Sequence, residues 1–299
     1  MRLRPLGTTD LQVSEISLGC MSLGLDHREN ARIIHAACDH GVNLFDTADL
    51  YDKGFNEISI GKALKDRRDK VFIATKVGNE WQEDGMGWQW NPHKSYIQKA
   101  VYESLRRLDT DYIDLYQLHG GTIEDPLDET ISAFEELKEA GLIRHYGISS
   151  IRPNVVRSWV PDTNIASVMT QYSLIDKRPE EFTLGYLNQH EVGVIVRGAI
   201  AKGYLVGKPA MDLLGHSSSD IQHFTRRLIE LAQDTPYSPL HLAIAFTLGH
   251  PSTTTVAMGA SRASHIIQSA KLMQLPPLSP ELYESLRTLT PAFAYDSHR

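Results

Sequence analysis

The feature that most constrains the fold is an alternation of short apolar runs with segments that carry apolar residues at helical spacing. Eight apolar runs are expected to be strands: Ile16–Leu18, Val42–Phe45, Val71–Thr75, Ile113–Leu118, Ile143–Ile148, Ala166–Thr170, Val192–Val196 and Thr254–Met258. Short runs rich in apolar residues are typical of parallel strands buried on both faces. Eight strand–helix units in one chain of 299 residues predict a (β/α)8 TIM barrel, with residues 1–299 forming a single domain.

Helices are expected between these strands. Six have predicted ranges: Glu29–His40, Asn56–Leu64, Leu127–Ala140, Glu180–Asn188, Ser238–Leu248 and Ala263–Lys271. A further helix is predicted by a stripe of apolar residues at helical spacing, Ile97, Val101, Leu105 and Leu108, and another begins at Pro153. Two segments are additional. Arg2–Val13 predicts a β-hairpin that plugs the barrel floor, and Ser279–Thr290 predicts an extra C-terminal helix on the outside.

The main alternative fold is a doubly wound open sheet, because the same alternation serves both architectures. No G-x-G-x-x-G follows the first strand, and no G-x-x-x-x-G-K-[ST] occurs in the chain. The absence of these phosphate-binding signatures favours the barrel.

Composition excludes several classes of protein. A formal net charge of −7 gives no attraction to nucleic acid, so no nucleic-acid partner is expected. The only two cysteines, Cys20 and Cys38, make a disulfide framework or a zinc site improbable. No apolar stretch reaches the length of a membrane span, and Met1–Gly7 lacks the apolar run of a signal peptide. These features predict a soluble, cytoplasmic protein with no membrane partner.

Four polar residues are the candidates for chemistry. Asp46, Lys76 and His119 each follow a predicted strand directly, and Tyr51 lies in the loop after Asp46. Residues just past the ends of parallel strands meet at one rim of a barrel. Taken singly, each residue is compatible with a cap or a turn. Together, on one rim, a carboxylate, a phenol, an ammonium and an imidazole indicate a proton-transfer site.

The chemistry of a carbonyl reduction matches these four residue types. Tyr51 can supply a proton, but an unperturbed phenol has a pKa of about 10 and is a weak acid at neutral pH. A neighbouring ammonium, Lys76, is expected to lower the pKa of Tyr51, with Asp46 holding the lysine charge. His119 can orient a carbonyl oxygen or join the proton relay. No metal is required, and no metal-ligand motif is present.

The chain resembles the aldo-keto reductases at these positions. Asn43–Tyr51 is similar to the family's Asp-to-Tyr signature, Ala74–Gly78 to its lysine strand, and Asp114–His119 to its histidine strand. Gly141–Ser149 resembles the strand that meets the nicotinamide. The order and spacing match along essentially the whole chain, as in the bacterial general reductases and the related potassium-channel β subunits.

The resemblance implies an oxidoreductase that uses NADP(H) to reduce a small-molecule aldehyde or ketone. It implies that Tyr51 is the general acid, that Lys76 and Asp46 tune it, and that His119 orients the substrate. Two alternatives stay open: an NADPH-binding redox sensor or regulatory subunit with slow turnover, and a barrel enzyme in which Lys76 forms a Schiff base. The pairing of Asp46 with Lys76 argues against the latter. The oligomeric state stays open, with a monomer preferred.

The resemblance also implies a set of cofactor-binding residues. Ser149 and Gln171 would hold the nicotinamide carboxamide, Arg197 would lie against the ring, and Ser261 and Arg262 would grip the 2′-phosphate. The full set is Ser149, Gln171, Arg197, Gly203, Leu205, Gly259, Ser261, Arg262, His265 and Gln268. For His265, an exposed helical histidine is the preferred interpretation and a phosphate contact the other.

Several positions depart from the family pattern. Ser150 replaces the usual asparagine, and Arg197 replaces the usual stacking tyrosine. Gln268 and Ser269 replace a Glu-Asn pair that lies against the adenosine, which leaves NADP over NAD as a preference.

Three loops are expected to shape the substrate end. The loop Gly78–Pro92 holds Trp81, Trp88 and Trp90, which could form an apolar wall over the site or pin the loop to the barrel. Gly120–Thr122 predicts an open pocket floor, and Lys208–Asp220, with Gly215 and three serines, predicts a flexible lid.

Overall fold

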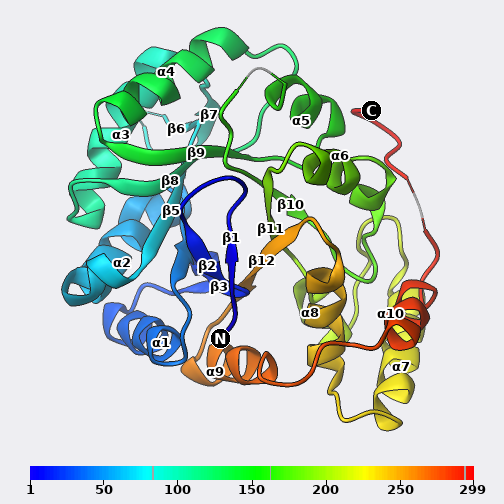
Figure 1. Ribbon diagram of the computed structural model, residues 1–299. Coiled ribbons are helices and arrows are strands. Elements are labelled where there is room, and N and C mark those ends of the chain that lie inside the picture. Colours follow the sequence, from blue (N-terminus) through cyan, green and yellow to red (C-terminus); the bar gives the residue numbers. More distant parts are fainter. Residues whose placement is uncertain (83, 162, 293) are drawn as a thin grey trace.

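Eight parallel strands close into a barrel in the order in which they occur along the chain (Figure 1). The computed structural model describes residues 1–82, 84–161, 163–292 and 294–299. The barrel strands are β3 (Ile16–Gly19), β4 (Leu44–Asp46), β5 (Phe72–Val77), β8 (Ile113–Leu118), β9 (Ile143–Ser149), β10 (Ser167–Gln171), β11 (Gly193–Arg197) and β12 (Thr253–Gly259). The predicted (β/α)8 barrel is confirmed. Both ends of each predicted strand lie within two residues of the ends of the observed strand.

Helices surround the barrel as expected. They are α1 (His27–Asp39), α2 (Phe55–Leu64), α3 (Lys94–Leu108), α4 (Leu127–Glu139), α5 (Pro153–Trp159), α6 (Thr183–Gln189), α8 (Pro239–Gly249), α9 (Ala263–Leu272) and α10 (Pro280–Arg287). α1 begins two residues before the predicted start, because Asp26 caps it by accepting from the backbone N–H groups of Arg28 and Glu29. α10 is the predicted C-terminal helix. Among the helices of the described residues, none is long and apolar enough to cross a membrane.

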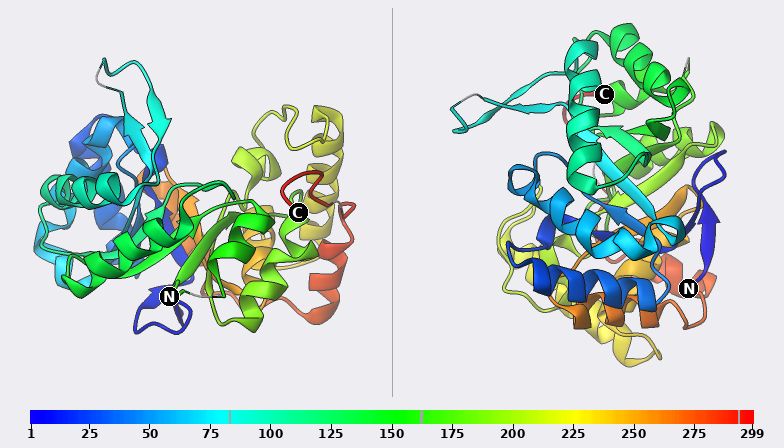
Figure 2. Two further views of the ribbon diagram at one scale, coloured as in Figure 1. Left: turned by 90° about the horizontal axis from the view of Figure 1, so that it is seen from above. Right: turned by 90° about the vertical axis from the view of Figure 1, so that its left-hand side faces the viewer.

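Among the described residues, one α-helix and two strands were not predicted. α7 (Ser218–Gln233) precedes α8, and its first turn takes up the end of the expected lid, so that expectation is wrong for Ser218–Asp220. Strands β6 (Asn79–Trp81) and β7 (Trp88–Trp90) pair as a hairpin within the predicted loop Gly78–Pro92, of which Glu83 lies outside the described residues. Figure 2 shows this hairpin projecting away from the barrel.

The N-terminal hairpin closes one end of the barrel, as predicted (Figure 1). Strands β1 (Leu3–Pro5) and β2 (Gln12–Ser14) pair antiparallel. The hairpin residues Leu6, Leu11 and Val13 are buried in one cluster with residues of the barrel strands such as Leu44 and Met169. The plug thus supplies the bottom layer of the barrel core.

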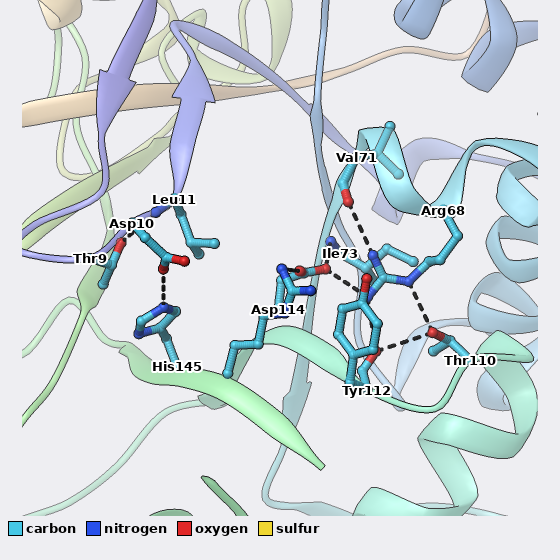
Figure 3. Close-up of polar contacts among 11 residues, drawn as sticks. Thr9, Asp10, Leu11, Arg68, Val71, Ile73, Thr110, Tyr112, Asp114 and His145 are labelled. Atoms are coloured by element: carbon cyan, nitrogen blue, oxygen red, sulfur yellow. Dashed lines mark hydrogen bonds and ion pairs between the residues drawn. The ribbon is translucent and has the colours of Figure 1, made fainter. Parts of the chain in front are cut away.

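Polar contacts at the same end attach the plug and fix the barrel wall (Figure 3). The carboxylate of Asp10 in the hairpin accepts a hydrogen bond from Nε2 of His145 on β9, with 2.8 Å between the two atoms. The fully buried Asp114 of β8 accepts from the backbone N–H of Ile73 at 2.9 Å and pairs with Arg68 at 2.7 Å. This end is therefore stabilised by an exposed contact, between Asp10 and His145, and by a buried one, between Asp114 and Arg68.

Gly7 at the hairpin turn is expected to tolerate no side chain. Its φ is +60°, and a Cβ there would lie 2.6 Å from the carbonyl oxygen of Ala166. Gly7→Ala should lower the free energy of unfolding by about 2–4 kcal/mol, from left-handed strain and overpacking together. The matched control is Gly141→Ala, where φ is +75° but no atom lies within 4 Å of the added Cβ. Urea unfolding should show a loss of only about 1 kcal/mol in that control; equal losses would contradict the packing argument.

Candidate active site

The structure brings the four predicted residues together at the carboxyl end of the barrel. Asp46 ends β4, Lys76 lies on β5, and His119 follows β8 directly. Tyr51 begins a short 3-10 helix, Tyr51–Gly54, in the loop after β4. The strands that carry Asp46, Lys76 and His119 are neighbours in the barrel, which explains how residues distant in sequence meet.

Lys76 is the centre of the cluster. Its Nζ lies 2.8 Å from the Asp46 carboxylate and donates to the backbone oxygen of Thr47 at 2.6 Å. It also donates to the Tyr51 hydroxyl at 3.4 Å. The side chain is 1% exposed, so nearly all of its polar contacts are with the protein.

The buried ion pair keeps Lys76 charged. Burial lowers the pKa of Lys76, but Asp46 and Tyr51 raise it by more, and the net direction is upward. Burial raises the pKa of Asp46, and the Lys76 ammonium opposes this. An amine held as an ammonium is not a nucleophile, so this arrangement argues against a Schiff base on Lys76.

The expected direction of the Tyr51 pKa is wrong. Lys76 does lower the pKa of the phenol, but burial raises it by more, so the net direction is upward. A phenol with a raised pKa is fully protonated at neutral pH. The Tyr51 hydroxyl therefore keeps its proton at neutral pH, and the Lys76 ammonium partly offsets the effect of burial on its pKa.

His119 is a neutral imidazole. Burial, followed by the charges of Lys76 and Arg197, lowers its pKa to about 3. Its ring meets the Tyr51 ring edge-on, with 5.8 Å between centroids. Within the described residues its Nδ1 is buried and has no hydrogen-bond partner. A neutral imidazole can orient a carbonyl through a ring N–H, but it is not a source of protons at neutral pH.

The predicted nicotinamide residues lie at the ends of consecutive strands. Ser149 ends β9, Gln171 ends β10 and Arg197 ends β11, so all three line one side of the same mouth. Gln171 and Arg197 touch: the Arg197 guanidinium donates to Gln171 Oε1 at 2.8 Å. Arg197 thus contacts an amide rather than forming a salt bridge at the rim. Ser150 is buried, and its hydroxyl accepts from the backbone N–H of Arg152.

The predicted phosphate and adenosine residues surround the start of α9. Ser261, Arg262, His265 and Gln268 are all exposed there. Ser269 is different, because its hydroxyl is buried and donates to the His265 carbonyl. Gly203 and Leu205 are buried in the 3-10 helix Ala201–Val206, and the Leu205 side chain packs in the hydrophobic core.

The donor set around the mouth fits an elongated anionic dinucleotide. Ser149 and Gln171 can hydrogen-bond a carboxamide. The N-cap residue Arg262 makes no side-chain bond to the first turn of α9, where the N–H of His265 donates to the Arg262 carbonyl, and a helix N-terminus favours an anion. A Cβ at Gly259 would lie 3.0 Å from Ser22 Oγ. The absence of a side chain at Gly259 therefore leaves room for a ligand to come close to the backbone there.

Trp90 pins the β6–β7 hairpin beside the site. Its indole N–H donates to Asp125 at 2.8 Å. A Cβ at Gly78 would lie only 2.7 Å from its ring, and a Cβ at Gly120, the neighbour of His119, would lie 3.4 Å from it in ordinary contact. Trp88, by contrast, is 49% exposed. Trp90 therefore has the pinning role, and an apolar wall over the site stays a prediction.

Some residues of the site were not predicted. Thr47 contributes a backbone oxygen, which carries no sequence signal. Gln117 lies 3.5 Å from Asp46; its position two residues before His119 on β8 was the available clue. Asp176, which binds Gln171, lies in a loop with no recognisable motif.

Comparisons with known proteins agree with this geometry. A sequence model described as the Aldo/keto reductase family matches residues 15–290. The uncharacterized oxidoreductase YqkF of Bacillus subtilis is 45% identical over 308 aligned residues, which cover both chains completely. The holo form of aldo-keto reductase AKR11C1 from Bacillus halodurans is 46% identical, with a TM-score of 0.94 over 100% of this chain and 99% of that one.

A more distant structure extends the likeness. An aldo/keto reductase from Klebsiella pneumoniae, solved with NADP and acetate, is 25% identical with a TM-score of 0.80, over 99% of this chain and 98% of that one. The family match over nearly the whole chain and the close relatives show that this chain belongs to the aldo/keto reductase family.

Proposed function

We propose that this chain uses NADPH to reduce aldehydes or ketones to alcohols, with Tyr51 as the general acid and residues 1–299 acting as one domain. The observation that carries the proposal is the series Tyr51–Lys76–Asp46, with contacts of 3.4 and 2.8 Å, in which Tyr51 is partly buried and the other two are buried. Membership of an oxidoreductase family supports the reaction class. The Klebsiella pneumoniae structures with NADP or NADPH, together with the donor set around the mouth, support NADP(H) as the cofactor.

When bound, the cofactor supplies the hydride. The protein supplies the proton and the position of the reacting carbonyl. Tyr51 donates its hydroxyl proton to the carbonyl oxygen as negative charge develops there. The Lys76 ammonium, 3.4 Å from the Tyr51 oxygen, stabilises the phenolate that remains. Asp46 keeps Lys76 charged, and His119 offers a neutral ring N–H that fixes the carbonyl without competing as an acid.

The cofactor-binding roles follow the chemistry of the rim. Ser149 and Gln171 would hold the nicotinamide carboxamide, with the Arg197 guanidinium against the ring, where a planar cation can stack. Ser261 and Arg262 would hold the 2′-phosphate at the start of α9, which favours NADP over NAD.

The loops at the mouth favour a substrate that carries apolar groups. Large hydrophobic side chains are exposed in the loops that follow β3, β5, β8, β9 and β11: Met21, Leu25, Met86, Trp88, Ile123, Ile151, Val206 and Met211. Exposed apolar side chains in the loops at the carboxyl end of the barrel support an apolar contribution to substrate binding. An aromatic aldehyde is therefore a suitable first probe.

The test is NADPH oxidation, followed by absorbance, with an activated aromatic aldehyde and with NADH in parallel. We expect turnover with NADPH and a higher KM for NADH, because NADH lacks the phosphate that Arg262 would hold. Tight NADPH binding without turnover would contradict the reductase and favour a redox sensor instead. Failure to bind either nucleotide would contradict both functions.

A further inference from the structure

The loop after β10 holds a buried carboxylate that the proposed reaction does not use. Asp176 is fully buried. Its two oxygens accept from Arg178, from Nε at 2.8 Å and from NH2 at 2.9 Å. The Oδ2 atom also accepts from Gln171 Nε2 at 2.9 Å. Asp176 thus joins a guanidinium on one side to the amide expected at the nicotinamide on the other.

The two neighbours of the Gln171 amide have opposite hydrogen-bonding character. A carboxylate only accepts, and a guanidinium only donates. Asp176 takes the NH2 end of the amide, and Arg197 donates to its oxygen at 2.8 Å. A flipped amide would set its oxygen against the carboxylate and its NH2 against the guanidinium. The orientation of Gln171 is therefore set by its surroundings.

The C-terminal tail shields this arrangement from water. The Tyr295 ring is 6% exposed and lies over the Arg178 guanidinium, 4.8 Å from it. The backbone N–H of Tyr295 donates to Glu181, and the carbonyl of His298 accepts from Asn154. Hydrogen bonds to a charged group are stronger where water is excluded, so the shield strengthens the hold on Gln171.

We propose that Asp176 is a positioning residue for the cofactor: by holding the NH2 end of Gln171, it presents the amide oxygen to the cleft as an acceptor for an N–H of the nicotinamide carboxamide. This inference rests on the proposed function. The oxygen has two lone pairs, so it can accept from Arg197 and from a ligand together. Asp176 itself does not touch the cofactor and acts through Gln171.

The test compares NADP⁺ with its 3-acetylpyridine analogue, in which a methyl group replaces the carboxamide NH2. The wild type should bind NADP⁺ about tenfold more tightly than the analogue, the equivalent of one good hydrogen bond. In Asp176→Asn the preference should fall to about twofold, because an asparagine can present either an oxygen or an NH2 and so lets Gln171 turn. Isothermal titration calorimetry measures both affinities without any turnover.

Two controls separate positioning from damage. The affinity for 2′,5′-ADP, which lacks the nicotinamide, should stay within about twofold of wild type in Asp176→Asn. The matched carboxylate control is Asp109→Asn, since Asp109 forms an exposed pair with Lys65 and has no part in the site; it should change neither affinity. In a Gln171→Met background, adding Asp176→Asn should change the NADP⁺ affinity by less than about twofold, because the group through which Asp176 acts is gone.

The outcomes are distinct. If folded Asp176→Asn keeps the wild-type preference for NADP⁺ over the analogue, this inference alone is overturned. The same holds if Asp176→Asn loses as much affinity for 2′,5′-ADP as for NADP⁺. A wild type that binds no NADP⁺ overturns the proposed function and this inference with it. Should Asp176→Asn fail to fold, Arg178→Lys is the second variant. It removes the paired hydrogen bonds that the guanidinium donates to Asp176 but keeps a cation, and it should also lower the preference for NADP⁺ over the analogue. An unchanged preference in that variant overturns the inference.

Discussion

Tyr51→Phe should lower kcat for carbonyl reduction by about 10²–10⁴-fold, the usual contribution of a positioned general acid. The change removes only the hydroxyl, whose described contact is a long one of 3.4 Å to Lys76. Lys76 keeps its bonds to Asp46 and Thr47, so the fold and the cofactor mouth should be unaffected. NADPH binding should therefore stay within about twofold of wild type, because no other buried group loses its partner.

The matched control is Tyr102→Phe, since Tyr102 lies on the outer face of α3 and is 60% exposed. Steady-state kinetics and NADPH titration on both variants measure the effect. The pH profile adds a second readout. Because the pKa of Tyr51 is raised, reduction by the wild type should be level from about pH 6 to 9, as the acid form persists. A wild-type kcat in Tyr51→Phe would show that another group donates the proton.

The barrel could be predicted because its strands obey a simple rule. β8 is buried along its whole length, and a strand buried on both faces is mostly apolar, although β8 also encloses Asp114 and Gln117. Element ends were less certain, as at α1, where the cap Asp26 lies before the apolar pattern begins. α7 was missed although its signal is present: Ser217 and Asp220 form a capping box, and Ile221, Phe224 and Leu228 follow on one buried face. Gly215 and the serines after it, Ser217–Ser219, are typical of a loop, and they favoured a lid there instead.

For the site, the sequence predicts which residues meet but not how burial and charge set their pKa values. The meeting of Asp46, Lys76 and His119 follows from topology, because all three lie at carboxyl ends of neighbouring strands. The balance of burial and charge does not follow, since it depends on how completely the groups are enclosed. That is why the pKa of Tyr51 moves opposite to the expected direction while Lys76 stays charged. The contact between Gln171 and Asp176 is likewise tertiary, because no residue pattern marks which loop carboxylate folds back onto the strand end.

Lys76→Met should abolish turnover and also destabilise the protein. Removing the ammonium leaves Asp46 buried without its partner, at a cost of about 3–5 kcal/mol. It also leaves the Thr47 carbonyl without the donor it has in the wild type. Met has nearly the length of Lys, so the cavity is small and the loss is chiefly electrostatic.

The destabilisation should depend on pH with a defined sign. Burial already raises the pKa of Asp46, and the loss of Lys76 removes the main influence that lowers it. In the variant, the folded-state pKa of Asp46 thus lies further above its unfolded value. Stability is then greatest at low pH and falls as pH rises through that raised pKa. The difference from wild type, measured by urea unfolding, should be smaller at pH 5 than at pH 8.

The double variant Asp46→Asn/Lys76→Met separates the two roles of the lysine. With the buried charge gone, the free energy of unfolding should recover by about 2 kcal/mol or more relative to Lys76→Met, because no unpaired ion remains. Turnover should not recover, because Tyr51 still lacks the cation that stabilises its phenolate. If the double variant regains activity along with stability, Lys76 serves only the fold, and the proton-transfer role assigned to it is wrong. If it regains neither, the loss in Lys76→Met comes from packing rather than from an unpaired Asp46.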